Sequence, residues 1–84
     1  MSGITLSQFE QIDGLMATLL RAGEFEMCAD PRGHIRTSNM LLDACIDALG
    51  LEYVNNFPCA LECAAHIVAM ALLGQIEVLD EEAA

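Results

Sequence analysis

Lysine is absent from this 84-residue chain, and its only cationic side chains besides histidine are Arg21, Arg32 and Arg36. Thirteen aspartates and glutamates give a formal net charge of −10 at pH 7. Proteins that bind a nucleic-acid backbone or an anionic lipid surface need clustered positive charge. The composition therefore predicts no direct nucleic-acid or membrane binding. It suits a basic protein partner, including one that normally holds nucleic acid.

Long apolar runs and targeting segments are also lacking. The longest apolar stretch, residues 58–73, has 16 residues with Glu62 and His66 inside it, whereas a bilayer-spanning helix needs about 20. The N-terminus has no basic region followed by an apolar run, as a signal peptide would. Since Cys45, Cys59 and Cys63 lie in apolar helical contexts, we expect a cytoplasmic protein with free thiols.

Catalytic motifs are missing as well: there is no phosphate-binding glycine loop, no GxSxG and no HExxH. Asp30, His34 and Arg36 come nearest to an acid–base group. No nucleophile or partner carboxylate accompanies them, so turn electrostatics explains them better. We expect no enzymatic activity, no catalytic residues and no cofactor.

Apolar residues are abundant, at 55% of the chain. A chain of this length forms one domain with a small interior. The surplus apolar surface then remains exposed as an interaction site or is buried in a homodimer. We therefore expect residues 1–84 to form a single domain that dimerises or holds a permanent partner, with residues 1–4 and 80–84 frayed.

The first helix is predicted to begin after Thr5. Thr5 and Gln8 have the spacing of a capping box, and Ile4 and Phe9 fall at the positions of a hydrophobic staple. Gly23 is expected to end this helix.

A β-hairpin is predicted over residues 24–37. Residues 30–33, Asp-Pro-Arg-Gly, form a strong turn sequence. With a three-residue loop and a glycine bulge, the flanking residues separate into two faces. The apolar face has Phe25, Met27, Ala29 and Ile35, and the polar face has Glu26, Cys28, Asp30, His34 and Arg36.

A second helix is predicted to start at one of residues 37–39, all of which are good N-caps. Gly50 is placed to end it in a left-handed conformation, with Leu51 contacting Ile46 as in a Schellman motif. Its buried stripe is predicted to be Leu41, Leu42, Cys45, Ile46 and Leu49.

Residues 58–73 are predicted to form a central helix, with Asn55 or Asn56 as its cap and Pro58 in its first turn. This helix is apolar or small on nearly every side, so the rest of the chain, a second copy or a partner must cover it. Residues 75–79 fit either a third strand or a helical extension. The fold class is therefore α+β: helix, β-hairpin, helix, central apolar helix, and a C-terminal strand or extension.

Cys59, Cys63 and His66 lie at i, i+4 and i+7 on one face of the central helix. Thiolate and imidazole are good zinc ligands, and His34 or Cys28 would complete a set of four. The spacing differs from the short CxxC loops of structural zinc sites, and nothing basic adjoins to lower a thiol pKa. Core cysteines beside a hydrogen-bonded histidine are the favoured interpretation.

The leading hypothesis is a non-enzymatic protein–protein interaction module, expected to be homodimeric, that regulates or inhibits a more basic protein. Its size and charge are similar to those of phage-encoded inhibitors of host machinery, anti-CRISPR proteins included, although no motif is shared. A head-to-tail dimer would bring the arginines against acids of the second half. The alternatives are a metal-binding or thiol-sensing module and a structural subunit of a larger assembly. The predicted partner-binding residues are Asp43, Asp47, Glu52, Glu62, Glu77 and Asp80.

Overall fold

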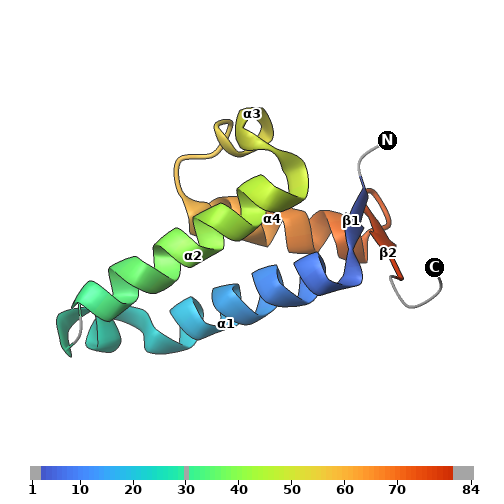
Figure 1. The fold of residues 1–84 in the computed structure, drawn as a ribbon. Helices are drawn as coiled ribbons and strands as arrows, with labels where there is room; N and C mark the ends of the chain where they lie inside the picture. The colour runs from blue at the N-terminus through green and yellow to red at the C-terminus, as the bar shows by residue number, and fades with distance from the viewer. Residues whose placement is uncertain (1–2, 30, 81–84) are drawn as a thin grey trace.

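The computed structural model describes residues 3–29 and 31–80 and shows a mostly helical α+β fold with a two-stranded parallel sheet. Its elements, in chain order, are β1 (Gly3–Thr5), α1 (Leu6–Ala29), α2 (Pro31–Leu49), α3 (Leu51–Val54), α4 (Ala60–Leu72) and β2 (Glu77–Leu79) (Figure 1). Within the described residues, no helix has both the length and the apolar character that crossing a membrane requires.

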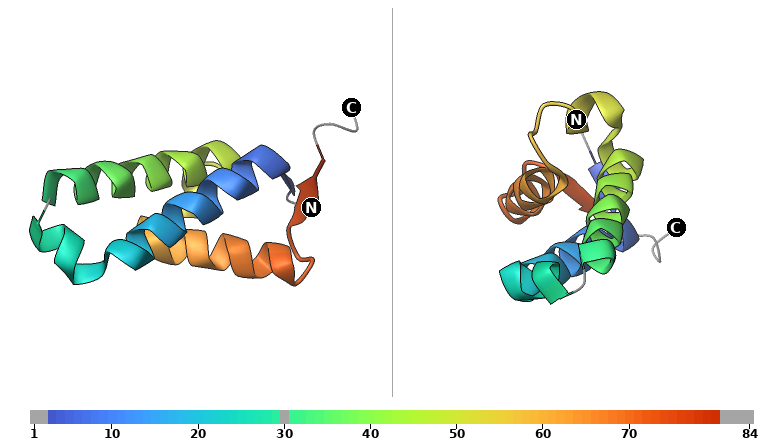
Figure 2. Two further views of the ribbon diagram at one scale, coloured as in Figure 1. Left: turned by 90° about the horizontal axis from the view of Figure 1, so that it is seen from below. Right: turned by 90° about the vertical axis from the view of Figure 1, so that its left-hand side faces the viewer.

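The two long helices α1 and α2 lie side by side and run in opposite directions, and α4 packs against both (Figures 1 and 2). The connection between α1 and α2 lies at one end of this pair, and that end extends beyond α4 (Figure 1). The molecule is therefore elongated, 42 × 27 × 20 Å. Only the opposite half of the α1–α2 pair is therefore covered by a third helix.

The predicted β-hairpin at residues 24–37 is wrong. Helix α1 continues past Gly23 to Ala29, and α2 already begins at Pro31. Proline is favoured at the first position of a helix, where its missing N–H is not needed, so Pro31, Arg32 and Gly33 form the first turn of α2 rather than a hairpin turn. Ile35, which the hairpin register places on the apolar face, is 58% exposed. Asp30 and the side chains of the other predicted hairpin residues up to Ala29 lie outside the described part.

The predicted start of the first helix is confirmed. The Thr5 backbone N–H donates to Gln8 Oε1 at 2.8 Å, and the Gln8 backbone N–H donates to Thr5 Oγ1 at 3.1 Å. These two reciprocal bonds are the capping box. Ile4 is buried and Phe9 packs against the same core, as the staple positions predict.

The Schellman motif forms at a different glycine from the one predicted. At Gly74 (φ +77°), the Gln75 N–H donates to Met70 O at 2.8 Å, and the Gly74 N–H donates to Ala71 O at 3.1 Å. These are the two bonds of the motif. Gly50 does have a positive φ, +93°, but its ψ of 158° is extended, and Leu51 begins α3 with its side chain exposed.

The expected caps of the second and central helices are also wrong. Helix α2 starts before residues 37–39, and α4 starts after Cys59, whose backbone is extended and whose side chain makes no cap bond. The Asn56 side-chain amide instead donates to Glu52 O and Tyr53 O at the end of α3.

The sheet joins the two ends of the described chain. β1 pairs with β2 in parallel, with Ile4 opposite Val78. The prediction for residues 75–79 is thereby decided in favour of a strand, over residues 77–79. The prediction that residues 1–4 are frayed is wrong for Gly3 and Ile4, which belong to β1, and Ile4 is only 1% exposed. Residues 1, 2 and 81–84 lie outside the described part.

The core lies where α1, α2 and α4 meet and extends to the sheet. Its largest fully buried side chains are Ile4, Ile12, Leu41, Ile67, Cys45 and Cys63. Helix α2 faces it as predicted, because Leu41 and Cys45 are buried while Leu42, Ile46 and Leu49 are half-buried around them.

Candidate functional site

The six predicted partner-binding acids are all exposed, but they do not form one patch. Asp43 and Asp47 lie on α2, Glu52 on α3, and Glu62 on α4, while Glu77 belongs to β2 and Asp80 follows it. Asp47 accepts a hydrogen bond from the Gln8 side-chain amide at 3.2 Å, which links α1 to α2. Among the described residues, no cation pairs with Asp43, Glu52, Glu62 or Glu77. These four carboxylates therefore remain available to a partner.

One face of α4 is apolar and uncovered. Its residues are three to four apart and therefore share one side of the helix. Leu72 and Leu73 are 77% and 69% exposed. We call this surface the bare face of α4; it consists of Glu62, Ala65, Ala69 and Leu72 of the helix and its C-cap residue Leu73, all exposed.

The opposite side of α4 packs into the core. Ala60, Cys63, Ala64 and Ile67 are buried there. The expectation that this helix must be covered is thus fulfilled on one side only. On β2, Leu79 is also 46% exposed.

Cys59, Cys63 and His66 do not converge on one point. Cys59 is exposed at the N-cap of α4, and Cys63 is fully buried. The His66 ring packs against Phe57 and Tyr53, with ring centroids 5.0 and 6.1 Å away. In residues 3–29 and 31–80, no group of three or more His, Cys, Asp or Glu side chains is arranged to hold a metal ion. The Cys28 side chain, a predicted fourth ligand, lies outside the described part.

The buried thiol of Cys63 contacts Cys45 of α2. Burial raises the pKa of Cys45 to about 12, and the charge and side-chain hydrogen bond of Cys63 add to this. Burial also raises the pKa of Cys63; the hydrogen bond from Cys45 acts in the opposite direction, and the charge of Cys59 raises it. Both thiols are therefore protonated at neutral pH and poor nucleophiles, because thiolate is the reactive form.

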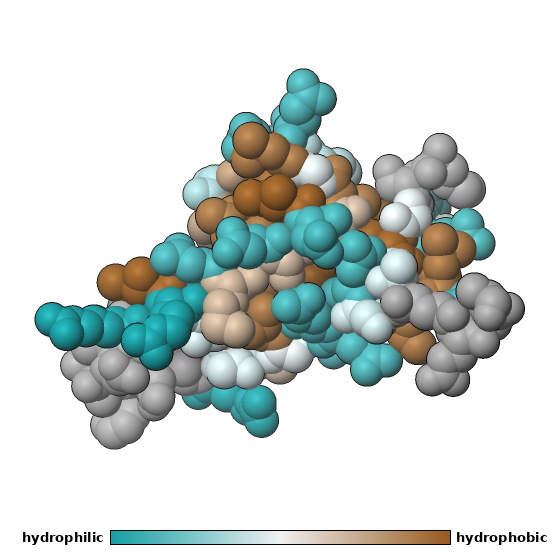
Figure 3. All heavy atoms as spheres, viewed as in Figure 1, coloured by the Kyte–Doolittle hydropathy of each residue, from teal (hydrophilic) through white to brown (hydrophobic). Residues whose placement is uncertain are grey.

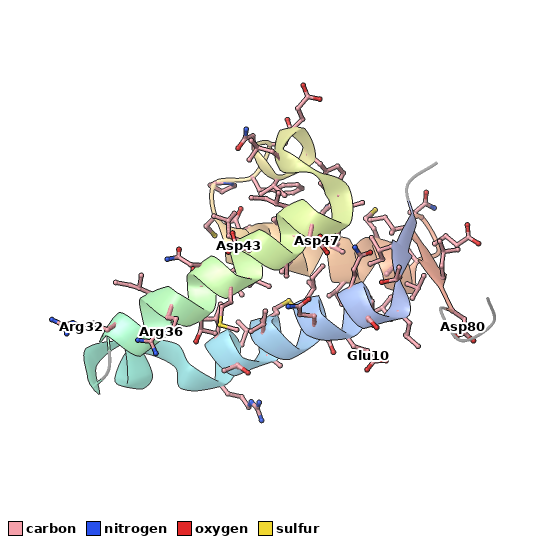
Figure 4. All side chains as sticks on the ribbon, in the orientation of Figure 1. Glu10, Arg32, Arg36, Asp43, Asp47 and Asp80 are labelled. Atoms are coloured by element: carbon pink, nitrogen blue, oxygen red, sulfur yellow. The ribbon has the colours of Figure 1, made fainter. Side chains whose placement is uncertain are left out.

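His34 and Arg36, predicted on the polar face of the hairpin, lie on α2 instead. Arg36 is exposed, whereas His34 is half-buried, and its Nδ1 has no hydrogen-bond partner among the described residues. Arg32 and Arg36 lie near the N-terminus of α2, where the chain arrives from α1, while Asp43 and Asp47 lie toward the C-terminus of α2 (Figure 4). In the same orientation, hydrophilic surface follows the line of these four residues between hydrophobic areas (Figure 3).

Two features of these surfaces were missed at the level of sequence. The exposure of Leu72 and Leu73 follows from which side of α4 turns toward α1 and α2, which periodicity does not give. The contact between the free thiols of Cys45 and Cys63 links α2 to α4. In the sequence, the only indication of this contact is that each cysteine lies on an apolar stripe of its helix.

Comparison of the chain with family models, with curated proteins and with solved structures finds no match.

Proposed function

We propose that this protein is a non-enzymatic protein-interaction module that acts as a homodimer and regulates or inhibits a basic protein. The observation that carries the proposal is the bare face of α4, where two exposed leucines share one side of the helix with Glu62, a carboxylate that no described cation neutralises. Large exposed apolar side chains grouped on one surface are typical of an interaction site.

The charge distribution supports a basic partner. Glu62 lies within the bare face, and Glu77 follows it on β2, next to the exposed Leu79. From Thr37 to the end of the chain there is no lysine or arginine. A partner with apolar side chains surrounded by Lys or Arg would bury the leucines and approach along a favourable field.

Site-specific photo-crosslinking in the cells that encode the protein tests the proposal. A photoreactive amino acid at Ala69, in the centre of the bare face, is expected to give an adduct with one basic protein. The matched control carries the same group at Thr18, which is exposed on α1. The adduct at Ala69 should decrease when Glu62→Arg or Leu72→Ser is added.

Equal adducts from positions 69 and 18 would contradict the proposed surface. An acidic partner at position 69 would contradict the electrostatic argument.

A further inference from the structure

The exposed face of α2 carries its charges in an unfavourable order for a single copy of the chain. Arg32 and Arg36 lie in the first two turns, and Asp43 and Asp47 lie in the last two; all four side chains are exposed (Figure 4). Within each pair, like charges four residues apart repel across one helical turn. Both pairs also oppose the helix dipole, which favours acids at the N-terminus and bases at the C-terminus.

The described part of the chain does not compensate for this order. Neither Arg32 nor Arg36 contacts a carboxylate among the described residues. Arg36 and Asp43 are seven residues apart, which is about 10 Å along a helix and too far for an ion pair. Asp47 receives only the neutral amide of Gln8.

We propose that a second copy of the chain supplies the missing charges, with its α2 packed antiparallel to this one across a two-fold axis between Asn39 and Met40. In that arrangement Arg36 lies opposite the partner's Asp43, and Arg32 lies opposite the partner's Asp47. The two-fold axis repeats both contacts. Self-complementarity of one patch is what a two-fold interface requires.

The same face also supplies apolar surface near the proposed axis. Ile35 and Met40 are 58% and 49% exposed and border the charged stripe on either side. The antiparallel arrangement would cover them, and it would also place the two helix dipoles in opposition, which is favourable.

This inference rests on the homodimer of the proposed function and specifies its surface. It assigns Asp43 and Asp47 to contacts within the dimer and leaves Glu62 and the leucines of the bare face of α4 to the partner.

Charge reversal with sedimentation analysis tests the arrangement. The variant R32D/R36D has only acids on the stripe, and D43R/D47R has only arginines, so each should dimerise at least about tenfold more weakly than the unmodified chain. An equimolar mixture of the two should form a heterodimer, because every opposed pair is then of opposite sign. The control E10R/D13R makes the same charge change as D43R/D47R, but on exposed positions of α1, and should leave the dimer intact.

Three results would overturn the inference, provided that circular dichroism shows all variants folded. If the unmodified chain is monomeric at about 100 µM, both this interface and the homodimeric part of the proposed function are wrong, while crosslinking at position 69 still tests the partner surface. If both reversal variants remain dimeric, dimerisation stands but uses another surface. If the mixture fails to restore association, Arg and Asp residues are not opposed as proposed.

Discussion

At the scale of single residues, burial separates cysteines that look alike in the sequence. Cys59 and Cys63 are four residues apart on the same helix, yet the first is exposed and the second is fully buried. Cys63 meets Cys45 across the α2–α4 contact, where each thiol fills core volume as a small hydrophobic group. The chemistry of Cys63 is set by this partner and not by its spacing from Cys59 and His66.

The buried thiols predict a loss of stability at alkaline pH. The pKa of Cys45 rises from an ordinary 9.0 to about 12 on folding, so the folded state holds its proton more tightly than the unfolded state. Stability should be complete below pH 9 and then decrease by up to about 1.4 kcal/mol per pH unit for this thiol. Urea unfolding between pH 8 and 11 measures the slope.

The slope should be smaller for Cys45→Ala than for Cys59→Ala, because Cys59 is exposed and acts only through its charge on Cys63. An unchanged slope in Cys45→Ala would mean that this thiol is not the group responsible.

At the scale of elements, a residue type that can end a helix does not have to end one. The Thr5–Gln8 capping box formed where its spacing predicted, because both bonds are local. Gly23, Gly50 and Gly74 were all suitable helix stops. The chain continues as helix through the first, turns sharply at the second, and forms a Schellman motif only at the third.

Two glycines should therefore respond oppositely to the same substitution. Gly74 has φ +77°, so Gly74→Ala strains the Schellman turn and should lower the free energy of unfolding by about 1 kcal/mol. Gly14 lies inside α1 with open space around its Cα. Gly14→Ala should raise the free energy of unfolding by about 0.5–1 kcal/mol.

Urea unfolding of both variants in parallel measures the two effects. A gain in stability from Gly74→Ala would contradict the left-handed turn that ends α4.

At the scale of the whole molecule, the two ends of the described chain form one small sheet against the helices. Each strand has three residues, and a sheet of this size has little stability of its own. Its stability comes from side chains that reach the core: Ile4 and Ile76 are buried, and Val78 is half-buried opposite Ile4.

Ile4 should consequently be as important as a residue of the helical core. Ile4→Ala is expected to lower the free energy of unfolding by about 2–4 kcal/mol, since it removes a side chain that is 1% exposed. Ile35→Ala, at a position 58% exposed, is the control and should change it by less than about 0.5 kcal/mol at concentrations where the chain is monomeric. Near-equal effects measured by urea unfolding would mean that the N-terminal segment is not part of the core.

Sequence patterns could predict the features that depend on neighbouring residues or on period alone. The capping box at Thr5 and the buried stripe of α2, with Asp43 and Asp47 outside it, are of this kind. The hairpin failed because residues 24–37 are too short for periodicity to separate strand from helix. When α1 and α2 are extended, the two helices pack along each other, and this packing stabilises these residues as helix. A short hairpin has little stability of its own.

The sequence alone determined the acidity, the absence of lysine and the apolar excess of this protein, because these depend on composition and not on conformation. Tertiary structure decided which part of that surface remains uncovered. Helix α4 can turn only one side toward α1 and α2, so its other side stays exposed, and the straight course of α2 from Pro31 places two arginines and two aspartates on one line. The first outcome depends on contacts between segments distant in the chain, which no local pattern records; the second depends on residues 31–36 being helical.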